Sequence, residues 1–288
     1  MNYYFNEMSW LQFSNLPGIS NLPLNEQVSQ YNFYLQEVAL SNIPWVLEQQ
    51  NAVATSGGGS PATPTEEFPG GGSGALTFNG TDEYFTALNA DVVNWLPGTG
   101  DFTIEFFIKK GVGGAGAPRV FSLGFDTGAT IGVSIESGTC YVWPYGGDLN
   151  GSMPAGYEAG TDWAHIAICR SGTTTKLFID GVLKDTKLND NRNITDALNP
   201  GFDLNVGVDD PLSNEANWWA GTLTNFRWDN SAIYTGSSLV VPTSPLSKTA
   251  TTKLLMLGGG STNPVYDAAQ LNSLVNNGAG WTAETPFV

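Results

Sequence analysis

The sequence has few basic residues, and these are unevenly placed. Lys and Arg number 11 against 27 Asp and Glu, the net charge is −16, and no Lys or Arg precedes Lys109. Like charges repel, so phosphate backbones and anionic lipid surfaces are poor partners for such a chain. We therefore expect no nucleic-acid partner.

Long apolar runs and helical patterns are also scarce. No apolar stretch reaches the length of a membrane-spanning helix, so membrane insertion is not expected. The first ten residues, MNYYFNEMSW, have neither the basic segment nor the apolar core of a signal peptide, and we expect none. Strand-forming residues interrupted by Gly, Asn, Ser, Thr and Pro predict an all-β chain instead.

Histidine and cysteine are too rare to suggest a metal cluster or a catalytic pair. Cys140 and Cys169 both fall in expected strands, where buried free thiols are common, and a disulfide between neighbouring strands is the alternative. His165 is the only histidine and has no nucleophile partner in the sequence, so we expect a structural role. The glycine runs lack the Lys and the helix that a phosphate-binding loop needs.

The stretch 162–186 predicts three consecutive antiparallel strands, Trp163–Arg170, Lys176–Ile179 and Val182–Thr186. Apolar residues alternate along the first of them and share one face, namely Ala164, Ile166 and Ile168. Asp180-Gly181 favours a tight type I′ hairpin, because that turn needs positive φ at both central residues.

Other segments extend the strand pattern. FTIEFFIK, Phe102–Lys109, alternates two sets of side chains and predicts a half-buried or doubly covered sandwich strand. In the last of the main strands, Leu223, Phe226 and Trp228 break strict alternation, which indicates a bulge. Further strands are expected on both sides of Asn79-Gly80 and at Pro118–Leu123, Thr130–Glu136, Thr139–Trp143, Asp203–Val208 and Trp219–Trp228.

Residues 1–51 form an unusual first unit. They contain no Lys or Arg and are dense in aromatic residues, too many for so short a segment to bury alone. One helix is expected over 25–40, and the flanking segments should be extended. We interpret the unit as an assembly anchor, with docking onto the sandwich as the alternative. The anchor residues are Tyr3, Tyr4, Phe5, Trp10, Phe13, Val28, Tyr31, Leu35, Val38 and Trp45.

Residues 52–74, AVATSGGGSPATPTEEFPGGGSG, have the composition of a flexible linker with stiffer proline points. The expected β domain follows at 75–288. The chain thus divides into an anchor arm, a linker and a head.

Four motif-bearing segments resemble a known family, and the last of them, Asp267–Phe287, has an Asp, then NNG and a terminal Pro-Phe. The hairpin LFIDGVL after a Trp-x-His strand resembles the middle of a laminin-G-like, concanavalin A-type jelly roll. GTLTNFRWDNSAIYTGSSLVVPTSPL, Gly221–Leu246, and the following TTKLLMLGG are similar to a segment of laminin-G-like domains in bacteriophage and other viral structural proteins. Trp228-Asp-Asn departs from the apolar residue, Lys and Gly that such domains commonly carry there. The resemblance extends from about Gly74 to the C-terminus.

This resemblance implies a two-sheet antiparallel jelly-roll sandwich carried by the N-terminal arm. It also implies a virion protein: a capsid decoration protein, a fibre or a tail appendage. Its expected partners are other virion proteins and sister subunits, contacted through the arm, and cell-surface glycans for host attachment. The rival interpretation is a soluble microbial carbohydrate-binding or adhesin module.

Two sets of candidate ligand-binding residues follow. Aromatic rings beside polar groups suit sugars, and Trp143, Tyr145, Trp218 and Trp219 lie near turns; packing at the core or rim is the alternative. Laminin-G-like domains often hold calcium at a loop rim with Asp and backbone carbonyls, so the resemblance points to Asp126, Asp209 and Asp210. Solvated loop acids are the alternative there.

We expect no enzyme. Glycoside hydrolases of this fold carry a Glu-x-Asp-x-x-Glu strand motif whose carboxylates flank the sugar bond. The sequence has no such motif, and Glu105 and Glu136 each stand alone on their strands.

Overall fold

The computed structural model describes residues 74–94, 96–114, 117–124, 131–143, 148–195, 203–209, 217–258, 265–269 and 272–287. The expected anchor residues, the helix over 25–40 and nearly all of the linker lie outside these residues.

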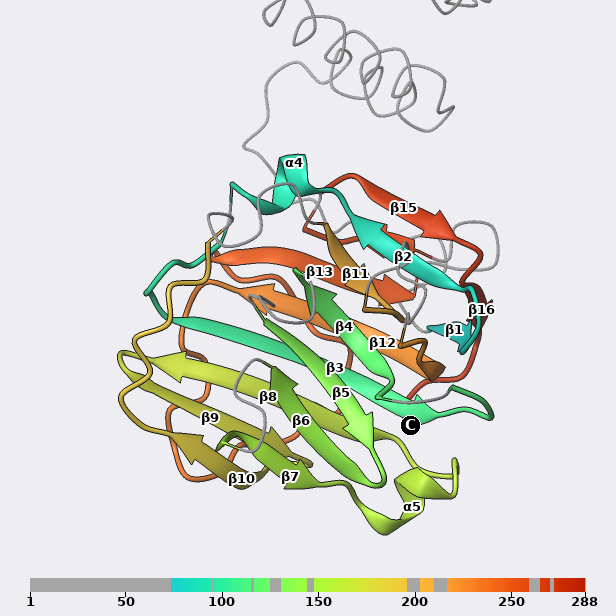
Figure 1. Cartoon of the computed structure of the whole chain (residues 1–288), viewed down its shortest axis with the longest axis horizontal. Helices are drawn as coiled ribbons and strands as arrows, with labels where there is room; N and C mark the ends of the chain where they lie inside the picture. Colours follow the sequence, from blue (N-terminus) through green and yellow to red (C-terminus); the bar gives the residue numbers. More distant parts are fainter. Residues whose placement is uncertain are drawn as a thin grey trace, which may run out of the picture. The chain divides into compact units, whose positions relative to one another are not determined.

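The described residues form two antiparallel sheets (Figure 1). The larger contains β1 (Ala75–Asn79), β3 (Phe102–Lys110), β8 (Ala164–Ser171), β9 (Thr174–Ile179), β10 (Val182–Lys187), β12 (Ala220–Asp229), β13 (Thr252–Gly258), β14 (Val265–Asp267) and β16 (Gly280–Thr282). Its strand order is β10-β9-β8-β3-β12-β1-β16, and β13 pairs with both β12 and β14.

The smaller sheet has the order β15-β2-β11-β4-β5-β6-β7. Its strands are β2 (Tyr84–Ala87), β4 (Arg119–Leu123), β5 (Ile131–Glu136), β6 (Thr139–Trp143), β7 (Asn150–Ser152), β11 (Leu204–Val206) and β15 (Leu274–Asn277). Two single-turn helices, α4 (Asn89–Val92) and α5 (Ala155–Glu158), lie outside the sheets. The predicted all-β jelly-roll sandwich is confirmed. No helix in the described part of the chain has the length and apolar character needed to cross a membrane.

The main hydrophobic core lies between the two sheets. Phe106 of β3 stacks on Phe226 of β12, with ring centroids 5.7 Å apart, and meets the edge of Phe121 of β4 at 5.8 Å. The core-facing positions of β3 and β8 alternate as predicted and are Phe102, Ile104, Phe106, Ile108, Ala164, Ile166 and Ile168. Alternation therefore determined which face of each strand meets the core.

The hairpin between β9 and β10 turns at Asp180-Gly181, whose φ values of 48° and 78° are both positive. This confirms the predicted turn chemistry. Asp180 also contributes its side chain, because its Oδ1 accepts a hydrogen bond from the backbone N–H of His165 at 2.8 Å.

The predicted irregularity in β12 lies at Asn225. The pairing register with β3 shifts between Thr224 and Arg227, and Asn225 has a φ of 55°. On its other side β12 pairs with β1 before the bulge and with β13 after it. The bulge therefore marks the point where β12 changes partner.

A long connection covers the outer face of the nine-stranded sheet. Residues 230–251, here called the strap, join β12 to β13. Tyr234 and Leu239 of the strap pack on Cys169 and Phe178 of the sheet. Near the other end of the sheet, Phe287 packs edge-on against Phe107, with centroids 5.2 Å apart. Consequently β3 is buried on both faces. Of the two predicted possibilities, half-buried or doubly covered, the second is confirmed.

Both cysteines are free and buried, and they lie on different sheets, Cys140 on β6 and Cys169 on β8. The expectation of unpaired buried thiols is confirmed.

Candidate functional site

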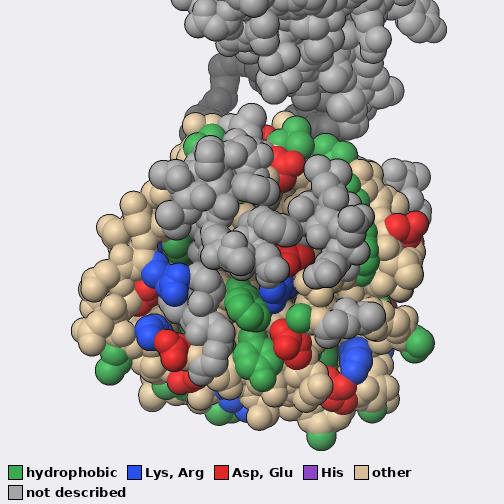
Figure 2. All heavy atoms as spheres, viewed as in Figure 1, with side chains coloured by type: hydrophobic (Ala, Val, Ile, Leu, Met, Phe, Trp, Pro, Cys, Tyr) green, Lys and Arg blue, Asp and Glu red, His purple; other side chains and the backbone are tan. Residues whose placement is uncertain are grey.

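The outer face of the seven-stranded sheet carries an aromatic stripe. On β6, Cys140 and Val142 point into the core, so Thr139, Tyr141 and Trp143 point outward and are half-buried. We call these three residues the β6 stripe. Figure 2 shows hydrophobic side chains at the middle of this face with acidic and basic groups beside them.

Trp143 is held in place by its neighbours. Its indole N–H donates to Ser134 Oγ at 2.9 Å, and Ser134 Oγ donates to Glu136 Oε1 at 2.7 Å. The Arg119 guanidinium lies over the ring, with Cζ 4.4 Å from the centroid. Arg119 is fixed in turn, because its Nε lies 3.4 Å from Asp209 Oδ2. The ring is therefore pre-positioned, which lowers the entropy lost when a ligand binds to it.

Polar side chains flank the β6 stripe on both sides. Tyr141 lies opposite Ser134 on β5 and opposite Asn150 on β7. Thr139 likewise lies between Glu136 and Ser152. Tyr141 and Thr139 thus lie between polar residues on both neighbouring strands, while Trp143 lies opposite Gly132 on β5.

Two of the other predicted glycan contacts, Trp218 and Trp219, lie off the β6 stripe. Trp219 is only 2% exposed and packs in the core against Phe78, with centroids 5.5 Å apart, so it is not a surface contact. The sequence indicated a position near a turn, but the ring belongs to the core between the sheets, which was the alternative. Trp218 is half-buried and packs on Tyr84 at 5.7 Å. Tyr145 lies outside the described residues.

Of the three calcium candidates, the structure describes Asp209 alone. Asp209 is buried in its ion pair with Arg119. Asp126 and Asp210 lie outside the described residues. Among the residues that the structure does describe, no group of three or more His, Cys, Asp or Glu could hold a metal ion.

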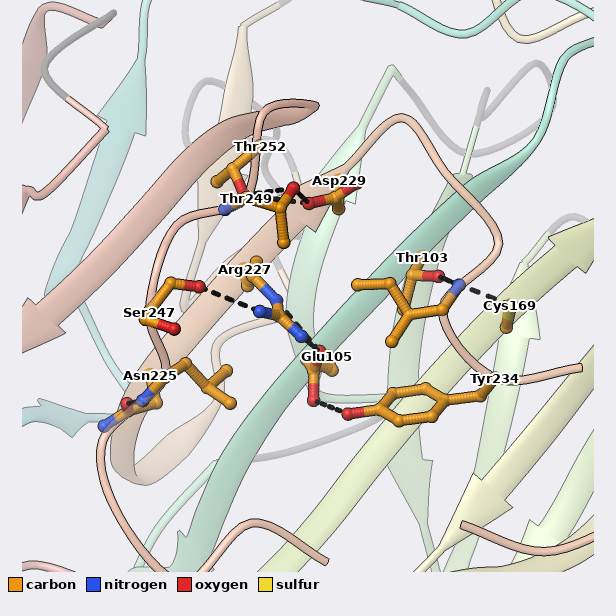
Figure 3. A network of polar contacts seen from close by, with 12 residues as sticks. Thr103, Glu105, Cys169, Asn225, Arg227, Asp229, Tyr234, Ser247, Thr249 and Thr252 are labelled. Carbon is orange, nitrogen blue, oxygen red and sulfur yellow. Dashed lines mark hydrogen bonds and ion pairs between the residues drawn. The ribbon is translucent and has the colours of Figure 1, made fainter. Parts of the chain in front are cut away.

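A second polar cluster lies under the strap, on the outer face of the other sheet (Figure 3). Its centre is Glu105 of β3, which is fully buried. Arg227 Nε donates to Glu105 Oε1 at 3.0 Å, while Tyr234 Oη donates to Oε2 at 2.8 Å. His165 Nε2 donates to the same Oε2 at 3.1 Å. The sequence suggested an isolated acid here, and the structure gives it three partners from three other segments.

Burial alone raises the pKa of Glu105, but the hydrogen bond from His165 and the charge of Arg227 outweigh it, so the pKa is lowered. Burial also raises the pKa of Tyr234, and the nearby Glu105 charge raises it further. Glu105 is thus a charged acceptor and Tyr234 a neutral donor. With its oxygens occupied and no exposure, Glu105 is poorly placed for acid or base catalysis.

The strap is held at both ends by side chains of β12 (Figure 3). Asp229 accepts hydrogen bonds from four hydroxyls, those of Ser231, Thr249, Thr251 and Thr252. At the bulge, Asn225 Oδ1 accepts the backbone N–H of Leu246 at 2.6 Å. The Asn-Phe-Arg motif and the segments that follow it therefore encode the attachment of the strap.

Sequence reasoning missed this cluster, although a signal was present. Thr103 and Glu105 on β3, and Arg227 and Asp229 on β12, are polar residues at alternate positions of strands whose other face is apolar. A polar row inside an otherwise apolar strand predicts partners on a covering segment.

Comparisons with known proteins agree with the fold. The model of a laminin-G-like family, described as the concanavalin A-like lectin/glucanases superfamily, matches residues 78–235, which is more than half of the chain. No curated protein matches the sequence significantly.

Of three solved structures that this chain resembles, one has a TM-score above 0.5 and shares the fold, and two are more distant. A proposed carbohydrate-binding protein from Bacteroides ovatus is 14% identical, with a TM-score of 0.55 over 75% of this chain and 61% of that one. The native heptameric SAP-like pentraxin from Limulus polyphemus is 16% identical, with a TM-score of 0.46 over 73% and 94% of the two chains. The LG4-5 domains of the mouse laminin α1 chain are 14% identical, with a TM-score of 0.36 over 59% and 46%.

Proposed function

Because the chain belongs to the concanavalin A-like lectin/glucanases superfamily, we propose that its β-sandwich is a non-enzymatic glycan-binding head whose ligand lies on the β6 stripe. One observation carries the proposal: Trp143 is half-buried, fixed by Ser134 and Arg119, and in line with Tyr141, which has polar residues opposite it on both neighbouring strands. Sugars need an aromatic surface for their apolar faces and hydrogen-bonding groups for their hydroxyls.

The location of the strap supports this choice of face. The outer face of the nine-stranded sheet is occupied by the strap, and its polar groups are bound to one another. The outer face of the smaller sheet instead presents half-buried side chains at Thr139, Tyr141 and Trp143 of β6 and at Glu136 of β5. A ligand therefore has more to contact there.

The carboxylates on this face support binding rather than hydrolysis. Glycoside hydrolysis usually requires two carboxylates on opposite sides of the scissile bond. Among the outward-facing residues of β5, β6 and β7, Glu136 is the one acid. One carboxylate does not supply both the acid and the nucleophile or base.

The larger setting of the head is also part of the proposal. We assign the protein to a virion, as a capsid decoration protein, fibre or tail appendage that contacts virion proteins and sister subunits through residues 1–51. The similarity of Gly221–Leu257 to segments of viral laminin-G-like domains and the aromatic, cation-free arm support this.

A soluble microbial carbohydrate-binding module is the second candidate. The structural similarity to the Bacteroides ovatus protein is compatible with it, and this chain spans about three fifths of that protein's length. Deleting residues 1–74 distinguishes the two. If the chain is a virion protein, the truncated form should fold but no longer be incorporated into particles. If it is a soluble module, neither the full chain nor the truncated form should be incorporated.

Glycan binding itself is tested with the full chain on a glycan array, followed by affinity measurement. Trp143→Ala is expected to weaken binding about tenfold or more, which corresponds to ~1.4 kcal/mol. Phe287→Ala removes a half-buried aromatic ring from the opposite sheet and serves as the matched control. If Trp143→Ala bound glycans with unchanged affinity, the β6 stripe would not be the binding site.

A further inference from the structure

We infer that the β6 stripe takes a neutral, hydroxyl-rich oligosaccharide and rejects acidic glycans, an inference that rests on the proposed function. Tyr141 and Trp143 are two residues apart on one strand, and both point outward. Such side chains are roughly 6.6–6.8 Å apart along the strand. Two rings at this spacing can each contact a different sugar unit, so the site suits a chain of sugars better than a single one.

The flanking groups match hydroxyls. On the β5 side, Glu136 offers oxygen acceptors, while Ser134 is buried and bonded to Trp143 and Glu136. On the β7 side, Ser152 is exposed and offers a hydroxyl, beside the half-buried amide of Asn150. Hydroxyl and amide groups both donate and accept, whereas an ionised carboxylate only accepts. Sugar hydroxyls can satisfy this mixture, but a sulfate or carboxylate, which only accepts, would face Glu136.

The charges on and around the stripe point the same way. Arg119, the cation nearest to Trp143 in the described structure, is buried and paired with Asp209. At the β7 edge, Lys187 is paired with Asp148 at 2.8 Å. Figure 2 shows basic side chains on this face as separate spots rather than as a patch. Acidic ligands usually need clustered cations, particularly Arg, as partners.

The net charge of −16 also produces a long-range electrostatic repulsion of anions. It slows the approach of any polyanion and leaves a neutral glycan unaffected. Short-range contacts and long-range field thus select against the same ligand class.

The test compares the full chain on neutral, sialylated, uronic-acid and sulfated oligosaccharides of matched length. We expect binding to neutral chains, with affinity changing less than about twofold between roughly 0.05 and 0.5 M salt, because screening affects only charged partners. Trp143→Ala should reduce affinity about tenfold or more, as above, and Tyr141→Ala about fivefold or more, which is the size expected for a well-packed aromatic contact. Glu136→Gln removes the negative charge that would face an acidic ligand, so it should reduce the ratio of neutral to acidic affinity.

The possible results distinguish a failure of this inference from a failure of the proposed glycan-binding function. A preference for acidic chains that depends on Trp143 would overturn the ligand class and leave glycan binding on the stripe intact. Equal affinity for monosaccharides and longer chains would overturn the two-ring arrangement. Binding to no glycan at all would defeat the proposed function, and this inference with it.

Discussion

Glu105 on β3 and Arg227 on β12 are paired directly across the nine-stranded sheet, and both side chains are buried. Arg227 also donates through Nη1 to the backbone carbonyl of Ser247 in the strap, at 2.9 Å. Tyr234, at the other end of the strap, donates to the same carboxylate. One ion pair therefore connects two strands of the sheet to both halves of the strap.

Neutralising Glu105 should destabilise the head strongly. Glu105→Gln leaves the buried Arg227 without its counter-charge, and breaking a buried pair in this way typically costs about 3–5 kcal/mol. Denaturant unfolding of the full chain measures the effect. Glu284→Gln is the matched control, because its pair with Lys109 is on the surface and the Glu284 side chain is 43% exposed. That change should cost less than about 1 kcal/mol, and equal losses in the two variants would show that the buried pair adds nothing.

Removing the Tyr234 hydroxyl should loosen the strap without disturbing the main core. Tyr234→Phe deletes a hydrogen bond to a charged group, which is worth about 1.5–3 kcal/mol. Trypsin reports the loosening, because Lys248 lies in the strap and is exposed. Cleavage after Lys248 should accelerate, while cleavage after the exposed Lys184 of β10 should not. Equal acceleration at both sites would indicate global unfolding instead.

The bulge at Asn225 combines a backbone and a side-chain requirement, which two variants separate. Asn225→Gly tolerates the φ of 55° but loses the hydrogen bond to Leu246, whereas Asn225→Ala loses that bond and strains the backbone as well. The left-handed conformation costs roughly 1–2 kcal/mol for a residue with a Cβ. Thermal unfolding should rank the wild type first, Gly second and Ala last. A glycine variant no more stable than the alanine variant would rule out a backbone contribution.

The framework of the sandwich could be predicted from local patterns. Alternation on β3 and β8, the positive-φ pair Asp180-Gly181 and the irregular spacing on β12 each depend on residues close together in the chain. Strand boundaries were correct to within one or two residues for most strands. Local sequence determines these features because side-chain direction in a strand has a period of two.

The partners of the polar residues could not be predicted. Glu105 meets His165, Arg227 and Tyr234, which are 60, 122 and 129 residues away along the chain. The sequence predicts that Trp219 and Trp143 both lie near turns, yet one is in the core and the other is half-exposed on the outer face. Such contacts depend on the pairing order of the strands, which no single segment encodes.

Acid should destabilise the head through two carboxylates. Burial raises the pKa of Asp229, but hydrogen bonds from Ser231 and three threonines outweigh it and lower the pKa, as the partners of Glu105 also do. A lowered pKa means that each group stabilises the fold above its ordinary pKa, 3.8 for Asp and 4.5 for Glu, and loses this effect as the pH falls through the lowered value. Melting temperature against pH should therefore drop below these values. Asp229→Asn should lower the melting temperature near neutral pH and make its fall at acid pH less steep. An equally steep fall in the variant would show that protonation of Asp229 is not coupled to unfolding.

The two thiols can report opening of the strap separately from opening of the sandwich. Burial raises the pKa of the Cys140 thiol to about 12 and also raises that of Cys169, so neither reacts readily at neutral pH while buried. Cys140 lies in the core between the sheets, whereas Cys169 lines a cavity of about 230 Å³ beside Tyr234 at the strap. Native-state labelling with a thiol reagent, followed by mass spectrometry, should modify Cys169 first. Tyr234→Phe should increase the labelling rate of Cys169 and leave that of Cys140 unchanged, because only the strap opens more often. If both cysteines instead reacted at one rate that tracked global stability, the strap and the sandwich would open as a single unit, and the attachment through Glu105, Asn225 and Asp229 would be as strong as the core itself.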